Sequence, residues 1–174
     1  MSKIFKTVAL IVVIGFGVLG FSHINKENSK PVASLDGREI DKKVLVVYLE
    51  EVLGDEYSQL LKSDDGLKTL ADYYINRTLL LGYAKETIGK DNPILTKHKA
   101  RGSDQDTMYL TALLKVEVQD KVVLTEKKIE QMMQVKPELS RAAVEAKLKG
   151  AMRAEYTNDL IEFVRKGHEI EYLI

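Results

Sequence analysis

The sequence predicts a mainly α-helical domain with a small β-sheet that joins its two ends. Apolar residues recur at the spacing of an α-helix over most of residues 41–166. Most of these segments begin at a capping residue or end at glycine or proline. Two short extended segments, residues 32–40 and 168–174, stand outside this pattern. Because a lone strand needs a partner, we expect both segments to meet in one sheet.

Length and composition limit the class of protein. The chain has 174 residues, with 26 basic and 26 acidic side chains, and no cysteine. This is the size of one domain, which needs no disulfide or metal to be stable. The lack of cysteine excludes thiol catalysis and thiolate zinc sites. Balanced charge argues against nucleic-acid binding, which depends on clustered excess cations.

The amino terminus has the pattern of an export signal. Lys3 and Lys6 precede 15 uncharged, mostly apolar residues, Thr7 to Phe21. As a helix this run is about 22 Å long, short of the roughly 30 Å hydrocarbon core. Adding the two apolar residues before Lys6 brings the apolar segment near the length that spans a membrane, if the Lys6 side chain reaches the membrane–water interface.

Two fates of this segment therefore stay open. Residues 1–22 are a cleaved signal peptide, or residues 4–22 are retained as an inner-membrane anchor. In either case we expect the rest of the chain to act in the periplasm or another extracytoplasmic space. Residues 23–30 are predicted to be a linker, and residues 31–174 to form the domain.

The domain is predicted to open with a strand, a turn and a strand. Asp36 and Gly37 are typical of a tight hairpin turn, and we interpret both as structural residues. Asp41 then suits the N-cap of a helix that runs to Gly54. A shorter helix is expected over residues 56–62.

A long helix is predicted over residues 64–89 and begins with two aspartates, which suit the positive end of a helix dipole. Its expected buried stripe is Leu67, Leu70, Ala71, Tyr74, Ile75, Thr78, Leu79 and Gly82. Arg77 lies beside this stripe, so its guanidinium must reach water or meet a carboxylate from another helix. We interpret Arg77 as a structural residue.

Pro93 suits the first turn of the next helix, which is predicted to run to Gln119 with a bend or break at Gly102-Ser103. Thr125 is predicted to cap a short helix that Pro137 ends, so both are interpreted as structural residues.

The last predicted helix runs from Glu138 to Lys166, and Gly167 is its expected stop. In the final segment, residues 168–174, polar and apolar side chains alternate well enough to predict a strand.

No catalytic, cofactor or metal motif is present in the sequence. His23, His98 and His168 are far apart, and none has metal-ligand spacing. Methionines and tyrosines give a functional indication, because they are able to form an adaptable surface for unfolded peptide. The candidate peptide-binding residues are Tyr48, Tyr74, Met108, Met132, Met133, Met152 and Tyr156. Core packing explains most of them equally well.

Taken in order, several segments resemble the SurA, PpiD and PrsA class of exported chaperones and foldases. VASLDGREIDKKVL is similar to the opening of that family's domain, and LLKVEVQDKVVLTEKKIEQMMQ and GHEIEYLI are similar to later segments. GLKTLADYYINRTLLLGYAKETIG resembles the family's hallmark helix through Leu70, Ile75, Asn76, Arg77, Leu79, Leu80, Leu81, Ala84 and Lys85. The similarity covers most of residues 31–174, and its motifs are loose individually but specific in their order.

The sequence departs from this family at one junction. In members that isomerise prolyl bonds, a parvulin catalytic domain follows the short helix after the threonine cap. Here Lys136, Pro137 and Glu138 alone separate Val135 from Leu139, whereas a small domain needs about 50 residues. No catalytic residue is therefore carried over, and we expect no enzymatic activity.

The resemblance implies an ATP-independent chaperone-like module without a cofactor. Its partners would be unfolded or extended segments of exported proteins, and the inner membrane if the anchor is retained. The alternative is a membrane-tethered assembly or interaction subunit of an export or polysaccharide machine with one dedicated partner. The sequence leaves open whether the chain forms a homodimer.

Overall fold

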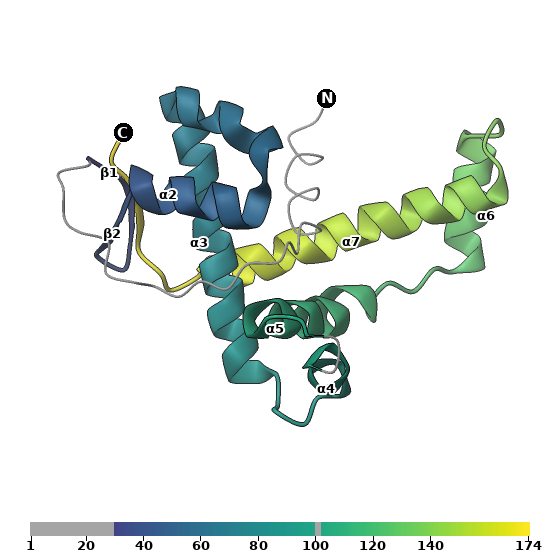
Figure 1. Cartoon of the computed structure of the whole chain (residues 1–174). Coiled ribbons are helices and arrows are strands. Elements are labelled where there is room, and N and C mark those ends of the chain that lie inside the picture. Colours follow the sequence, from purple (N-terminus) through teal and green to yellow (C-terminus); the bar gives the residue numbers. More distant parts are fainter. Residues whose placement is uncertain (1–29, 100–101) are drawn as a thin grey trace.

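The computed structural model describes residues 30–99 and 102–174. Its elements are mainly helices, and three short strands form one antiparallel sheet with the order β2-β1-β3 (Figure 1). The predicted fold class and the meeting of the two ends in one sheet are confirmed. The predicted export segment lies outside the described residues. Within the described part, no helix has the length and apolar character that a membrane span requires.

Strands β1, Pro31–Leu35, and β2, Arg38–Asp41, form the predicted hairpin. Its two turn residues both have positive φ, 51° at Asp36 and 74° at Gly37. Such a turn twists in the sense that the flanking strands require, and aspartate and glycine are among the residues that adopt it most readily. The prediction that these two residues form the turn is confirmed.

Strand β3, Ile170–Tyr172, lies on the other side of β1 and is anchored at its start by the hairpin turn. The Asp36 N–H donates to the Glu169 carbonyl at 2.8 Å, and the Asp36 carboxylate accepts the Glu169 N–H at 3.0 Å. The same carboxylate lies 2.8 Å from His168 Nδ1. The contacts with His168 and Glu169 hold the pKa of Asp36 below its ordinary value.

The helix after the hairpin is α2, Lys42–Tyr48, which continues as the π-helical turn η1, Leu49–Leu53. The Asp41 carboxylate caps it by accepting a first-turn N–H at 2.9 Å, as predicted. Gly54, with φ of 93°, ends it. The next segment, η2, Asp55–Lys62, is helical as expected but has 3-10 geometry.

The long helix α3, Asp64–Thr87, is the centre of the molecule and begins at the N-cap Ser63. Its buried residues are Gly66, Leu67, Leu70, Ala71, Ile75, Leu79, Leu80 and Ala84. The prediction that Thr78 and Gly82 belong to the buried stripe was wrong, because both are exposed. Helix α3 contacts η2, α5, α7, α2 and β1, so its buried surface is wider than one helical stripe.

The predicted helix after Pro93 is broken into two. Helix α4 is Pro93–Lys99, and α5, Gln105–Leu114, continues as the π-helical turn η3, Lys115–Gln119. Gly102 has a φ of 74°, which a helix does not accommodate. The Asp104 side chain then caps α5 by accepting an N–H at 2.9 Å.

Helices α6, Glu126–Val135, and α7, Arg141–Arg165, follow. Thr125 caps α6 as predicted, accepting an N–H at 3.4 Å, and α6 ends before Pro137. The predicted start of the last helix at residue 138 was wrong by three residues. The Ser140 hydroxyl accepts an N–H of the first turn at 3.3 Å, so this side chain sets the start of α7.

Helix α7 divides the described chain into two regions (Figure 1). Its carboxyl-terminal half packs on the rest of the protein, which we call the body. Its other half extends away and carries α6, and we call α6 with residues 141–152 the arm. Within the arm, Ile129 and Val144 are buried, and Arg141 pairs with Glu126 at 2.6 Å.

The body has one apolar core, to which β1, α2, α3 and α5 each contribute. Its largest fully buried side chains are Val32, Leu45, Leu70, Ile75 and Leu113. Residues from both ends of the described chain meet in this core, so the small sheet is packed on the same apolar cluster as the helices.

A polar network ties the end of α7 to α3 and β3. The Arg165 guanidinium donates to Asp72 at 3.0 Å, to Asn76 at 2.7 Å and to the Tyr172 hydroxyl at 3.1 Å. The Tyr172 hydroxyl in turn hydrogen-bonds the Asp72 carboxylate. Arg77 is half-buried and has no ion-pair partner among the described residues. The ion pair that joins α3 to another helix is instead made by Arg165 of α7 with Asp72.

Candidate binding groove

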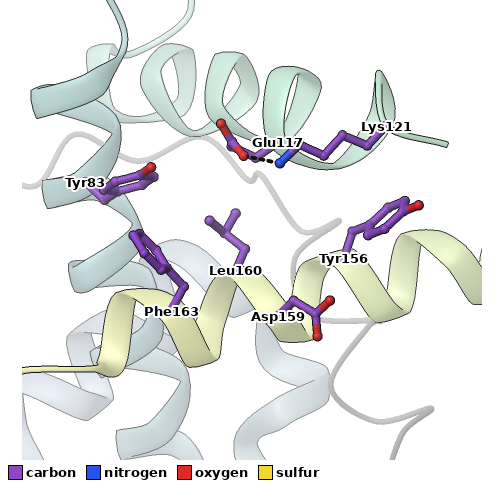
Figure 2. Close-up of a pocket in the computed structure, with 7 residues that line it drawn as sticks. All are labelled: Tyr83, Glu117, Lys121, Tyr156, Asp159, Leu160 and Phe163. Carbon is purple, nitrogen blue, oxygen red and sulfur yellow. Dashed lines mark hydrogen bonds and ion pairs between the residues drawn. The ribbon is translucent and has the colours of Figure 1, made fainter.

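A groove of about 350 Å³ lies where α7 passes α3 and the end of η3 (Figure 2). Helix α3 supplies one wall, η3 and the turn after it supply the second, and α7 forms the floor. The lining residues are Tyr83, Glu117, Lys121, Tyr156, Asp159, Leu160 and Phe163. The groove therefore depends on three elements that are distant in sequence.

Two aromatic rings stand at one end of this groove. Tyr83 on α3 and Phe163 on α7 face each other edge to face, with centroids 5.4 Å apart and planes at 69° (Figure 2). This arrangement is a favoured one for aromatic pairs. Phe163 nevertheless remains 55% exposed. Phe163 thus presents apolar surface to solvent, and its contact with Tyr83 holds its ring in position.

Charged and amphipathic side chains line the other end. Lys121 Nζ lies 2.5 Å from the Glu117 carboxylate, and Tyr156 stands below this ion pair on α7 (Figure 2). The hydrogen bond that Lys121 donates to the Glu117 carboxylate raises the pKa of Lys121. Both side chains of the pair are solvent-accessible, so the pair contributes little to stability. Its hydrogen-bonding groups are available to a bound chain.

A second hollow of about 360 Å³ continues along the junction of α3 and α7. It shares Tyr83 and Phe163 with the first hollow, and its other lining residues are Thr78, Leu79, Gly82, Glu86, Val164, Lys166 and His168. We call the two hollows together the α3–α7 groove. Gly82 faces open space here, since apart from its chain neighbours and the nearby backbone of its own helix no heavy atom lies within 4 Å of where a Cβ would stand. Its missing side chain leaves room at the α3 wall of the groove rather than in the core.

Of the seven candidate peptide-binding residues, only Tyr156 lines the groove. Tyr48 lies in the core, 3% exposed, with its ring edge-on to Tyr74 at 5.5 Å. Its hydroxyl donates to the Tyr73 carbonyl at 3.4 Å, and burial raises its pKa. Tyr48 therefore offers no surface to a partner in this structure.

The other candidates are divided between the two regions. Tyr74 and Met108 are half-buried against the body core. Met132, Met133 and Met152 are half-buried on the arm. The structure therefore does not bring the predicted residues together in one surface.

Sequence reasoning missed the aromatic pair at the centre of the groove. Tyr83 and Phe163 each follow the apolar periodicity of a helix, which predicts a core position as readily as an exposed one. An available signal was the charge near Phe163, since Glu162 and Lys166 lie close to it in the sequence and are both exposed. Pairing with Tyr83 was beyond reach, because it depends on how α7 crosses α3.

Comparisons with known proteins add no family to these observations. No family model, curated protein or solved structure matches the chain. Among the described residues, no three acidic or histidine side chains are placed to hold a metal ion.

The α3–α7 groove presents aromatic contact surface and paired charges. This combination is suited to binding a flexible polypeptide.

Proposed function

We propose that the protein is an ATP-independent chaperone-like module that binds unfolded or extended segments of exported proteins in the α3–α7 groove. The observation that carries this proposal is the exposure of Phe163, which remains 55% accessible although it stands between two hollows. Exposed aromatic surface in a concave region marks an interaction site more often than an isolated exposed residue does.

The shape of the groove supports an extended segment as the ligand. The two hollows lie on either side of Tyr83 and Phe163, so a chain that crosses the pair is able to contact both. Apolar side chains of the client would cover the two rings, while its backbone would meet the polar groups of Glu117 and Lys121. Binding is expected to be weak and reversible, because ordering the client offsets part of the burial gain.

The short connection between α6 and α7 supports a role without catalysis. It spans residues 136–140 and ends in the cap of α7. The foldases that the sequence resembles carry their isomerase domain at the corresponding junction. Within this proposal the export signal of residues 1–22 brings the module to the periplasm or to the outer face of the inner membrane.

The proposal is tested by suppression of aggregation. The full-length chain in lipid nanodiscs is mixed with a chemically unfolded envelope protein, and light scattering is followed, with empty nanodiscs as the blank. We expect suppression by the wild-type chain and its loss in Phe163→Ala. The matched control is Val135→Ala, which removes a 73% exposed apolar side chain from the arm and should change nothing. Absence of suppression at several-fold excess would refute the proposal.

A second experiment distinguishes many clients from one dedicated partner. Chemical cross-linking in intact cells, followed by purification, is expected to recover many substoichiometric unfolded proteins. A single stoichiometric partner would instead identify the chain as a dedicated subunit of an assembly machine.

A further inference from the structure

Strand β3 has a free edge. The sheet order β2-β1-β3 leaves one side of β3 unpaired among the described residues. On its paired side, the Leu173 N–H donates to Val32 at 2.9 Å, and the Glu169 carbonyl accepts from Asp36 at 2.8 Å. Hydrogen-bonded positions alternate along an antiparallel strand. The backbone N–H and C=O of Ile170 and Tyr172 therefore point away from β1, toward the open side.

This edge is held in place by the side chains of the same strand. Ile170 and Tyr172 pack against the body core. The Tyr172 hydroxyl bonds Asp72 and Arg165, and Lys68 Nζ stands 4.6 Å from the centre of its ring. The open hydrogen-bonding groups are thus presented by a strand that is already ordered, which lowers the entropic cost of adding a partner.

The exposed face of β3 has a defined chemistry. Glu169 and Glu171 are both exposed and lie on the same face, since side chains alternate along a strand. Leu173 is next on that face and is also exposed. Read along the strand, this face presents two carboxylates and then an apolar side chain.

These carboxylates argue against a second copy of the chain as the occupant. In antiparallel self-pairing centred on Ile170 or on Glu171, Glu171 stands opposite a glutamate of the other copy. Like charges directly opposite each other destabilise a sheet. Charged side chains on an edge are also a common protection against self-association. Opposite charge on an incoming strand would be favoured at the same positions.

We propose that the open edge of β3 binds an extended, basic polypeptide segment as a fourth, antiparallel strand. Its backbone would bond the N–H and C=O groups of Ile170 and Tyr172. Lysine or arginine would stand opposite Glu171 and Glu169, and an apolar residue opposite Leu173. From its amino end, the segment has the pattern apolar-x-basic-x-basic. This site is separate from the α3–α7 groove and does not depend on the proposed function.

The test uses a labelled peptide, acetyl-Thr-Leu-Thr-Lys-Thr-Lys-Thr-amide, and the full-length chain in nanodiscs. Binding is measured by fluorescence anisotropy, and amide hydrogen exchange is measured residue by residue. In the free chain we expect the amides of Ile170 and Tyr172 to exchange faster than those of Glu171 and Leu173. Bound peptide should protect the first two selectively.

Two sets of variants test the geometry and the charge. N-methylation of the two threonines opposite Ile170 and Tyr172 should abolish binding, whereas N-methylation of the two lysines should not, because those N–H groups point away. Glu171→Lys should weaken binding roughly fivefold, from the size of a cross-strand charge pair. The matched control is Glu130→Lys, a charge reversal at an exposed position of the arm that should leave affinity unchanged.

Several results would overturn the proposal. They are no binding, equal affinity for the two N-methylated peptides, or equal affinity for a peptide with glutamate in place of lysine. Loss of binding in Phe163→Ala would place the peptide in the groove instead. Concentration-dependent protection of Ile170 and Tyr172 without peptide would identify a second copy of the chain as the occupant.

Discussion

The body and the arm are built from the same kinds of helices but bury very different amounts of apolar surface. In the body, strands and helices from both ends of the described chain share one core around α3. In the arm, Ile129 and Val144 are the buried side chains, and neither belongs to the body core. Free energies of local opening depend on such burial. The body is therefore expected to be a stable frame for the groove and the arm to open first.

The largest effect is expected from a cavity in the body. Leu70 is fully buried in α3, so Leu70→Ala should lower the free energy of unfolding by about 2–5 kcal/mol. Denaturant unfolding followed by circular dichroism measures it. A loss well below 1 kcal/mol would contradict the central place of α3 in the core.

A cavity in the arm should have a smaller and local effect. Val144 is fully buried, and Val144→Ala should cost about 1–3 kcal/mol from lost methyl groups and the remaining cavity. Amide hydrogen exchange should accelerate in α6 while α3 keeps its protection. Equal acceleration in both helices would show that arm and body unfold as one unit.

Loss of the N-cap of α7 should lower the stability of the arm slightly less than the Val144→Ala cavity does. Ser140→Ala removes the hydroxyl that accepts the first-turn N–H, and a lost cap typically costs about 1 kcal/mol. Faster exchange confined to the first turn of α7 is the expected result. Ser140→Asp is the matched control, because aspartate also caps a helix and should keep the wild-type exchange rate.

The smallest effect concerns the surface contact between the hairpin turn and the start of β3. The pKa of Asp36 is lowered by His168 and by the Glu169 N–H, so the folded state favours its ionised form. This contribution is present above the ordinary aspartate pKa and is lost as the pH falls through the lowered folded value. Asp36→Asn should therefore flatten the acid side of the stability profile, measured by thermal unfolding. An unchanged profile would show that the contact contributes nothing.

Local sequence signals predicted the elements of the fold, and tertiary packing decided what they missed. The Asp36-Gly37 turn, the Asp41 and Thr125 caps and the pairing of the two ends follow from backbone chemistry that short segments encode. The burial of α3 followed in part: Leu67, Leu70, Ala71, Ile75 and Leu79 are buried as predicted. The burial of Leu80 and Ala84 did not follow, because several elements pack around this helix. The groove was also out of reach, since Tyr83 and Phe163 meet only when α7 crosses α3.

The most direct test of the central claim is photo-cross-linking from the groove. A photoreactive phenylalanine analogue replaces Phe163, or Val135 on the arm as a control, and the full-length chain is mixed with an envelope protein that is either unfolded or folded. We expect strong cross-linking from position 163 to the unfolded form only, and little from position 135. Equal yields from both positions, or equal yields with folded and unfolded protein, would contradict a groove that binds extended segments.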